Sequence, residues 1–278
     1  MTDILTTIRN HKLGEVAEAR QRRTLDELKR EAAAQPPARG LARAMRGDRA
    51  ADEPRRPGRR PRLLAEIKRA SPSAGLIRED FDPVALACSY AAGGADAISC
   101  LTDEKFFKGS LDYLRAVRGA VDLPVLRKEF IIDPWQVWEA RAAGADAVLL
   151  IAGIIDWSAQ AELREEARAA GLDVLLEIHS DEELEPALEL RPDLLGINNR
   201  NLRTRDLHTD LSTTLRLAPR MPAEIVLLSE SGIRTADDVR QLAALGIDGV
   251  LVGEHLMREP DPGAAIAGRL GLGPGWRE

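Results

Sequence analysis

Three observations predict a single α/β domain with the (β/α)8 architecture of a TIM barrel, preceded by extra N-terminal helices. Eight short runs rich in Val, Ile and Leu follow residue 62, and amphipathic stretches of about 10 to 15 residues separate them, as in βαβ units. The 278 residues, 44% of them hydrophobic, suffice for one such barrel. Because only 4% are aromatic, the core must consist mainly of branched and small residues, as barrel interiors do. A doubly wound open sheet is the alternative, but no GxGxxG motif follows the first run.

The eight apolar runs mark the expected strands. They are LLAEI from residue 63, AISCL from 97, PVLRK from 124, AVLLI from 147, VLLEI from 174, LLGIN from 194, IVLLS from 225 and GVLVG from 249. One phrase recurs before three of them, as AAGGADAIS, AAGADAVLL and ALGIDGVLV, ending at Ser99, Leu150 and Val252. In each repeat we expect a helix to end at a glycine with positive φ and to lead directly into a strand.

Helix starts are also marked in the sequence. Asp82-Pro83 and Asp133-Pro134 predict an N-cap followed by a first-turn proline. Ser180 and Glu183 have the spacing of a capping box. These signals predict helices between the strands.

Residues 1–278 are expected to form one domain in three parts: a helical extension over 1–48, an Arg/Pro-rich connection over 49–62, and the barrel over 63–270. Residues 3–34 predict one or two helices. The density of Pro, Gly and like charge in the connection predicts an exposed, mobile segment. Its five arginines between Arg55 and Arg62 also allow nucleic-acid binding, but the absence of interleaved aromatic residues favours a solvated linker.

Composition limits the partners and the location. The formal net charge of -6 gives no global attraction for nucleic acid or anionic lipid. We find no run of about 18 apolar residues and no leader-like N-terminus, so a cytoplasmic protein without membrane contact is expected, by default a monomer. Cys88 and Cys100 lack CxxC spacing and are interpreted as core thiols, which argues against a metal site or a disulfide framework.

The candidate catalytic residues are polar side chains that close the apolar runs, because barrel active sites form at the carboxyl ends of the strands. They are Glu66, Lys68, Lys128, Glu177 and Asn198. Glu66 and Lys68 are two residues apart and should share one face of their strand. Four convergent ionisable groups are costly to bury without a function, which favours acid/base catalysis over a structural salt bridge.

The loops after the seventh and eighth strands predict a phosphate site. Glu230-Ser231-Gly232 and Gly253-Glu254 stand there, where this fold frequently binds phosphate with glycine-rich loops and a helix N-terminus. Glycine lets backbone N–H groups approach phosphate oxygens closely. Because a second anion would repel the phosphate, we expect Glu254 to contribute its backbone and to turn its side chain outward.

With these residues assembled, the sequence closely resembles the indole-3-glycerol phosphate synthase family over nearly its whole length. The matching stretches are EIKRASPSAG, SCLTDEKFFKGS, LRKEFI, LLEIH, GINNRNL, SESGI and LVGEHLM. Glu254 departs from the many relatives that carry Ser there. The resemblance implies a phosphosugar-anthranilate substrate, 1-(2-carboxyphenylamino)-1-deoxyribulose 5-phosphate, which closes to indole-3-glycerol phosphate with loss of carbon dioxide and water, without cofactor or metal.

The resemblance also implies residue roles. Lys128 resembles the general acid at the ketone carbonyl, while Glu177, Glu66 and Lys68 resemble the proton-transfer groups, with Asn198 positioning them; which group protonates the departing hydroxyl stays open. The expected substrate contacts are Ser71, Phe107, Phe130, Leu149, Arg200, Glu230, Ser231, Gly232, Gly253 and Glu254. The competing interpretations are phosphoribosylanthranilate isomerase, a non-catalytic paralogue, and a nucleic-acid-binding module built on Arg55 to Arg62.

Overall fold

Eight parallel strands close into a barrel in the computed structural model, which describes residues 4–200, 209–273 and 276. Around the barrel the strands are ordered β1-β10-β9-β8-β7-β6-β5-β4. Their bounds are β1 (Arg62–Ile67), β4 (Ala97–Leu101), β5 (Val125–Lys128), β6 (Ala147–Ile151), β7 (Asp173–Ile178), β8 (Leu194–Asn198), β9 (Val226–Glu230) and β10 (Gly249–Val252). The predicted barrel is confirmed, and each expected strand agrees with the observed one to within a residue at either end.

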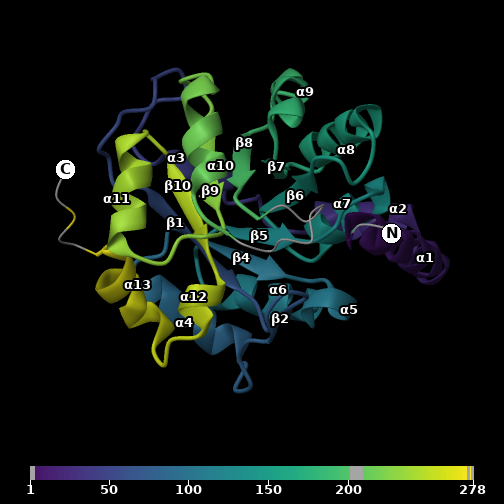
Figure 1. Cartoon of the computed structure of the whole chain (residues 1–278). Helices are drawn as coiled ribbons and strands as arrows, with labels where there is room; N and C mark the ends of the chain where they lie inside the picture. The colour runs from purple at the N-terminus through teal and green to yellow at the C-terminus, as the bar shows by residue number, and fades with distance from the viewer. Residues whose placement is uncertain (1–3, 201–208, 274–275, 277–278) are drawn as a thin grey trace.

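Helices follow the strands and surround the barrel (Figure 1). They are α4 (Pro83–Ala92), α6 (Leu111–Ala120), α7 (Pro134–Ala142), α8 (Trp157–Ala169), α9 (Leu184–Glu189), α10 (Ser212–Leu217), α11 (Ala236–Ala244) and α13 (Pro262–Leu270). Short elements lie in the connections: the hairpin β2 (Ala70–Ser71) and β3 (Gly75–Leu76), the helices α5 (Glu104–Phe107) and α12 (Glu254–Met257), and the 3-10 turns η1 (Asp181–Glu183) and η2 (Ala218–Arg220).

Alternation along each strand divides the core into two layers. Leu64, Leu126 and Leu175 belong to the apolar cluster inside the barrel. Their neighbours on the same strands, such as Leu63 and Val125, belong to the cluster between the strands and the surrounding helices. Side chains two residues beyond the inward leucines therefore also point inward, towards the carboxyl end of the barrel.

The repeated phrases end helices and anchor strands, as predicted. Gly94, Gly144 and Gly246 all have positive φ, between 72° and 92°. The aspartate two residues after each glycine then accepts a hydrogen bond from a backbone N–H group of the preceding strand. For Asp96 the donor is the amide of Leu63, at 2.8 Å, and Asp146 and Asp248 repeat the contact in their own units. The repeat is a structural device that sets the register between neighbouring strands.

Two local predictions are confirmed and two are wrong. Asp82 and Asp133 cap α4 and α7, each with a proline in the first turn. Ser180 makes no capping hydrogen bond, because the carboxylate of Glu183 instead accepts a hydrogen bond from the backbone N–H of His179. Of the two predicted core thiols, Cys100 is buried but Cys88 is exposed on α4, since it lies on the helix side that faces away from the strands.

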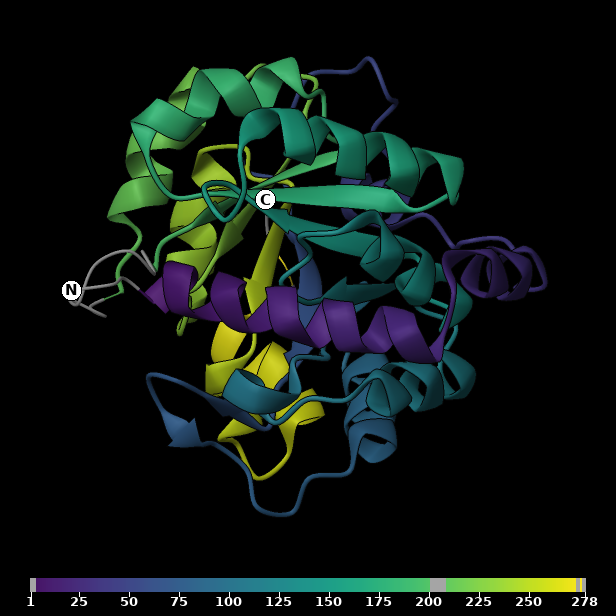
Figure 2. The ribbon, with the colours of Figure 1, turned by 90° about the vertical axis from the view of Figure 1, so that its right-hand side faces the viewer.

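The N-terminal extension forms three helices, α1 (Ile4–Arg22), α2 (Leu25–Ala33) and α3 (Leu41–Arg46). In Figure 2, α1 crosses the face of the molecule turned to the viewer. Leu5 and Ile8 of α1 and Leu41 and Met45 of α3 join the apolar cluster inside the barrel. Because α1 contacts the loops after β4 and β5, and α3 contacts the starts of the strands through a bond from the Ala42 amide to Asp173, the two helices cover opposite ends of the barrel.

The arginine-rich connection is exposed over much of its length, as predicted, but it is also hydrogen-bonded to the barrel. Arg49 is only 3% exposed. The amide of Arg55 donates to the carbonyl of Ala223 at 2.9 Å, and the amide of Gly58 donates to that of Ala243 at 2.8 Å. The connection runs along the amino end of the barrel, and these hydrogen bonds attach it there.

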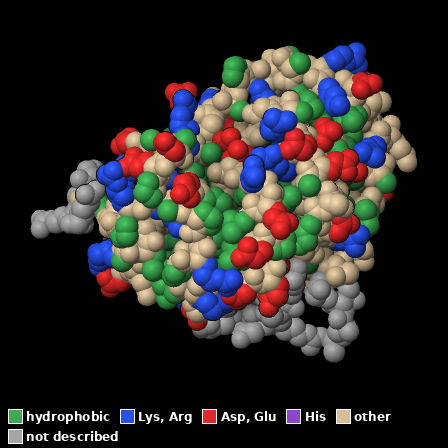
Figure 3. Space-filling view, turned by 90° about the horizontal axis from the view of Figure 1, so that it is seen from above, with side chains coloured by type: hydrophobic (Ala, Val, Ile, Leu, Met, Phe, Trp, Pro, Cys, Tyr) green, Lys and Arg blue, Asp and Glu red, His purple; other side chains and the backbone are tan. Residues whose placement is uncertain are grey.

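The surface mixes charges of both signs. In the view from above in Figure 3, basic and acidic side chains lie side by side across the face turned to the reader. Among the residues that the structure describes, none of the helices combines the length and apolar character needed to cross a membrane.

Candidate active site

A cavity of about 550 Å³ opens at the carboxyl ends of the strands. Its wall includes the polar residues that follow the inward apolar positions of β1, β5, β7, β8 and β9, as alternation requires. Fourteen of the fifteen predicted site residues line it: Glu66, Lys68, Phe107, Lys128, Phe130, Leu149, Glu177, Asn198, Arg200, Glu230, Ser231, Gly232, Gly253 and Glu254. Ser71 is the exception; it is buried behind Ser73, and their hydroxyl oxygens are 3.3 Å apart.

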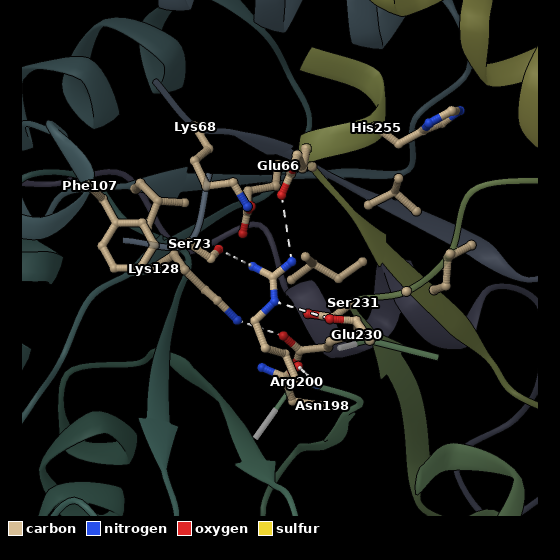
Figure 4. A pocket seen from close by; sticks show the side chains of 18 of the residues that line it. Glu66, Lys68, Ser73, Phe107, Lys128, Asn198, Arg200, Glu230, Ser231 and His255 are labelled. Atoms are coloured by element: carbon tan, nitrogen blue, oxygen red, sulfur yellow. Dashed lines mark hydrogen bonds and ion pairs between the residues drawn. The ribbon is translucent and has the colours of Figure 1, made fainter. Parts of the chain in front are cut away.

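Lys128 lies at the centre of a buried charge cluster. Its Nζ atom donates to Oε2 of Glu177 at 2.9 Å and to Oε2 of Glu230 at 2.6 Å. Figure 4 shows the side chains of Lys128 and Glu230 pointing towards each other. Both carboxylates are at most 2% exposed in their side chains. Glu230, predicted as a substrate-binding residue, shares Lys128 with Glu177, and both of these neighbours are predicted to be catalytic.

Two glycines, one within a strand and one directly after a strand, make room for the buried carboxylates. A Cβ atom on Gly196 of β8 would collide with Oε1 of Glu230. A Cβ atom on Gly253, directly after β10, would collide with Oε1 of Glu66 and lie 2.9 Å from its Cβ. These glycines therefore allow two carboxylates to point into a closed barrel, where any larger residue would displace them.

The cluster separates the protonation behaviour of its members. Burial alone would lower the pKa of Lys128, but the charges of Glu177, Glu230 and Glu66 outweigh that effect and raise it. Burial opposes ionisation of Glu177 as well, yet Lys128 and His179 hold its pKa well below the ordinary value. Burial and the neighbouring charge of Glu177 raise the pKa of Glu230 to about 7. One carboxyl group thus stays ionised while the other titrates near neutral pH.

Glu66 and Lys68 form a second pair at the mouth. Lys68 Nζ lies 2.6 Å from Oε1 of Glu66, with side chains only 10% and 5% exposed. Both side chains line the same cavity, as predicted from their spacing. Asn198 ends β8 and lines the same cavity, and its Oδ1 atom accepts a hydrogen bond from the amide of Arg200 at 2.9 Å.

A buried histidine lies within ion-pair distance of the Glu177 carboxylate. His179 Nε2 lies 3.0 Å from Oε1 of Glu177, and its Nδ1 lies 3.5 Å from Oε2 of Glu183. Burial would lower the pKa of His179, but Glu177 and Glu183 outweigh it and raise the pKa to about 9. The ring is therefore a cation at neutral pH that holds Glu177 in its ionised form.

Phe107 and Phe130 form an aromatic wall on one side of the cavity, with ring centroids 5.9 Å apart. Each ring is placed by a buried carboxylate: Asp103 caps α5 by accepting from the Phe107 amide, and Glu129 accepts from the Phe130 amide. Both carboxylates lie 2.9 Å from Nζ of Lys12 on α1, whose side chain is 1% exposed. A lysine of the N-terminal helix therefore contacts both carboxylates that position the two aromatic rings.

The opposite side of the cavity is built from the loops after β9 and β10. Ser231 and Gly232 are consecutive residues with positive φ, 66° and 80°, a conformation that can turn backbone N–H groups towards a bound anion. The guanidinium of Arg200 reaches across to the Ser73 hydroxyl at 3.2 Å (Figure 4). Gly253 and Glu254 complete this end of the cavity wall.

The side chain of Glu254 does not turn away from the cavity as expected. It lies between two guanidinium groups, 3.6 Å from Arg200 and 3.0 Å from Arg258. Its burial favours protonation, but Arg258, Lys68 and Arg200 lower the pKa overall. The two nearby arginines offset the predicted repulsion between this carboxylate and a phosphate.

Sequence reasoning missed several residues of the cavity wall. They include Ser73, Glu129, Arg234, His255 and Arg258. Ser73 lies within the quoted stretch EIKRASPSAG, and His255 lies within LVGEHLM, so their position next to motif residues was an available signal. The burial of Lys12 had no such signal, because a lysine on a charged helix is typical of a solvated face.

The comparisons with known proteins agree with this geometry. The family model "Indole-3-glycerol phosphate synthase" matches residues 5–268. A protein of that name from Rhodopirellula baltica is 58% identical over 200 residues, covering 72% of this chain and 76% of its own length. Those from Azospirillum brasilense and Albidiferax ferrireducens are 48% and 46% identical, covering 97% and 96% of this chain and 100% and 98% of their own.

Solved structures show the same fold at lower identity. A 3-hexulose-6-phosphate synthase matches with a TM-score of 0.59 and 21% identity, over 75% of this chain and 97% of its own. A mutant tryptophan synthase alpha-subunit from Pyrococcus furiosus matches with a TM-score of 0.57 and 17% identity, over 78% of this chain and 98% of its own. Since the family model spans nearly the whole barrel and the extension before it, the chain belongs to the indole-3-glycerol phosphate synthase family.

Proposed function

We propose that the chain closes the ring of 1-(2-carboxyphenylamino)-1-deoxyribulose 5-phosphate to indole-3-glycerol phosphate, a step of tryptophan biosynthesis, by general acid and base catalysis. The observation that carries the proposal is the ammonium of Lys128 between the buried carboxylates of Glu177 and Glu230. This cluster lies in the cavity that also contains the aromatic wall and the glycine-bearing loops.

The two ends of the cavity suit the two ends of this substrate. Backbone N–H groups at Ser231, Gly232 and Gly253 bind the phosphate in our proposal. Phe107, Phe130 and Leu149 pack against the anthranilate ring. A substrate held at both ends presents its ketone carbonyl to Lys128, because the lysine lies between these two contacts.

The first chemical step forms the carbon–carbon bond. The ring carbon that bears the carboxylate attacks the ketone carbon, and Lys128 donates a proton to the carbonyl oxygen, which becomes a hydroxyl group. The bond to the carboxylate then breaks, carbon dioxide leaves, and its electron pair restores the aromatic ring. Positive charge on Lys128 stabilises the oxygen as it gains negative charge.

The second step removes water. The hydroxyl group leaves with a proton from an acid, and the neighbouring carbon of the sugar chain loses a proton to a base, which forms the double bond of the indole. We assign these transfers to Glu177, Glu230 and the Glu66–Lys68 pair, with Asn198 orienting the reacting chain. A carboxyl group with a pKa near 7, as for Glu230, can both give and accept a proton at neutral pH.

The test is to mix the purified protein with this substrate in the absence of metal and to follow the rise of indole fluorescence. We expect a steady rise that Lys128→Ala lowers by several orders of magnitude while the protein stays folded. Lys29→Ala is the matched control, because its amine lies over the ring of Trp138 outside the cavity. Near-normal turnover by folded Lys128→Ala would remove Lys128 from the mechanism, and no turnover by the wild type would reject the proposed substrate.

A further inference from the structure

A second cavity lies at the amino end of the barrel, opposite the candidate active site. Its volume is about 180 Å³, against about 550 Å³ for the active-site cavity. It is bounded by Met45, Arg46, Arg49, Arg56, Arg59, Arg60, Arg62, Gly246, Ile247 and Asp248. Six of these ten residues are arginines and one is an acid, so the wall is strongly electropositive. We call this cavity the arginine pocket.

The acids near the arginine pocket neutralise only part of this charge. Asp248 lies 3.0 Å from Nη2 of Arg49 and also accepts from the amide of Leu227. Arg60 and Arg62 share the carboxylate of Asp96, at 3.3 and 2.9 Å. These three guanidinium groups already have close acidic partners.

The remaining three arginines, Arg46, Arg56 and Arg59, have guanidinium N–H groups that can donate hydrogen bonds to a ligand. Among the described residues, the one acid that Arg59 reaches is Asp48, at 3.8 Å; Asp48 is itself 89% exposed, so water screens the pair. Arg56 pairs with Glu53 from an exposed position. Within the described part of the chain Arg46 forms no ion pair, and its buried Nε atom has no hydrogen-bond partner. A buried guanidinium N–H without an acceptor is costly, which indicates that an acceptor from outside the chain fits here.

The arginines are held in place rather than carried on a free loop. Gly47 has a φ of 64°, and a Cβ atom there would lie 2.6 Å from Nη2 of Arg62, so only glycine leaves room for that guanidinium. The amides of Arg55 and Gly58 bond to carbonyl groups of the barrel. Because the segment is anchored on both sides of Arg56, little ordering entropy opposes the binding of a ligand.

We propose that the arginine pocket binds a small, multiply charged oxyanion of the phosphate class. Guanidinium groups match phosphate oxygens with paired hydrogen bonds. The smaller volume favours inorganic phosphate, pyrophosphate or the phosphate end of a sugar phosphate over the whole substrate of the active site. Since the amino face of a barrel serves stability rather than chemistry, we assign the site a stabilising role: an anion that binds only the native state raises the unfolding temperature.

The experiment compares two double variants with the wild type. Arg46→Gln with Arg59→Gln removes two charges from the arginine pocket. Arg43→Gln with Arg115→Gln removes two charges from exposed side chains that do not line it. Pyrophosphate binding is measured by calorimetry and by the unfolding temperature, with sodium chloride at equal ionic strength as the reference. Indole formation, which uses none of these residues, confirms that each variant is folded.

We expect the wild type and the Arg43/Arg115 variant to bind pyrophosphate at this pocket, and the Arg46/Arg59 variant to bind it roughly tenfold more weakly or not at all. Binding at the active-site phosphate loops, if present, stays equal in all three proteins. Equal total binding in both double variants would overturn the proposal. Repeating the titration with phosphate and with ribose 5-phosphate shows whether the free anion or a sugar phosphate binds more tightly. If Arg46/Arg59 does not unfold cooperatively, Arg56→Gln, at an exposed position, replaces it.

Discussion

Lys128 and Glu230 form an ion pair of 2.6 Å in which the carboxyl group, not the amine, is the member whose protonation changes near neutral pH. The reason is that Lys128 also faces Glu177 at 2.9 Å. One ammonium group cannot fully compensate two buried carboxylates, so burial and repulsion raise the pKa of Glu230 to about 7 while that of Glu177 falls. This difference supports our proposal that the pair transfers protons.

Glu230→Gln should lower kcat by about 10²- to 10⁴-fold, the usual contribution of a general acid or base. The pH dependence is the sharper readout. In the wild type kcat should change with an apparent pKa near 7, and this transition should be absent in Glu230→Gln. Glu162→Gln, an exposed position on α8, is the control that should keep the wild-type profile. An unchanged profile in Glu230→Gln would assign the transition to another group.

His179 should make the protein less stable as the pH rises above neutrality. The pKa of its ring is about 9 in the folded protein against 6.5 for an ordinary histidine side chain. The folded state therefore binds the proton more tightly, so the stabilisation is complete below pH 6.5 and is lost as the pH rises through about 9. At most roughly 3 kcal/mol should be lost across this window.

Urea unfolding at a series of pH values measures this loss. His179→Asn should flatten the decline in the free energy of unfolding between pH 6.5 and 9. His11→Gln, on the partly exposed side of α1, should leave it in place. If both variants decline as the wild type does, the dependence belongs to other groups.

Much of the fold and of the site was predictable because both depend on alternation along buried strands. Leu64 predicts that Glu66 and Lys68 point inward, and the same step of two residues leads from Leu126 to Lys128. The strand ends of a closed barrel converge, so the sequence needed only to mark where each apolar run stops. The repeated Gly and Asp residues were recognisable for a similar reason, since positive φ after a helix is a local requirement.

The unpredicted features depend on contacts between distant segments. Ser180 and Glu183 have the spacing of a capping box, but the carboxylate of Glu183 accepts a hydrogen bond from the amide of His179 and lies near its ring. In the sequence, Lys12 has the pattern of a surface lysine. It is buried only because α1 packs on the loops that carry Asp103 and Glu129. The proposed catalytic role of Glu230 depends on its contact with Lys128, 102 residues earlier in the chain. Periodicity carries no information about such pairings.

Lys12→Met should destabilise the protein and weaken substrate binding together. Removing the ammonium leaves Asp103 and Glu129 buried without their common cation, which typically costs about 3–5 kcal/mol. Because these carboxylates hold the amides of Phe107 and Phe130, KM should rise more than kcat falls. Urea unfolding and steady-state kinetics measure the two effects.

Two further variants separate the positioning effect from a general loss of stability. Lys29→Met removes a lysine from α2 that has no buried carboxylate partner in the described structure, and it should leave both quantities near the wild-type values. Lys12→Met combined with Asp103→Asn should regain part of the stability, because asparagine still caps α5 without the uncompensated charge. Failure of the second change to restore any stability would argue against the charge explanation.

Gly253→Ala should damage the active site with little effect on the rest of the barrel. The added Cβ atom would collide with Oε1 of Glu66 and lie 2.9 Å from its Cβ, so the Glu66 side chain must move and its 2.6 Å pair with Lys68 must break. We expect kcat/KM to fall by at least about tenfold, which corresponds to about 1.4 kcal/mol of lost transition-state stabilisation.

Gly268→Ala is the matched control, because a Cβ atom on that residue of α13 would meet nothing within 4 Å. That substitution should keep kcat/KM and raise stability by roughly 0.5–1 kcal/mol, since alanine favours a helix interior. Equal kcat/KM for the two variants would mean that Glu66 tolerates displacement and that its pair with Lys68 is not needed for turnover.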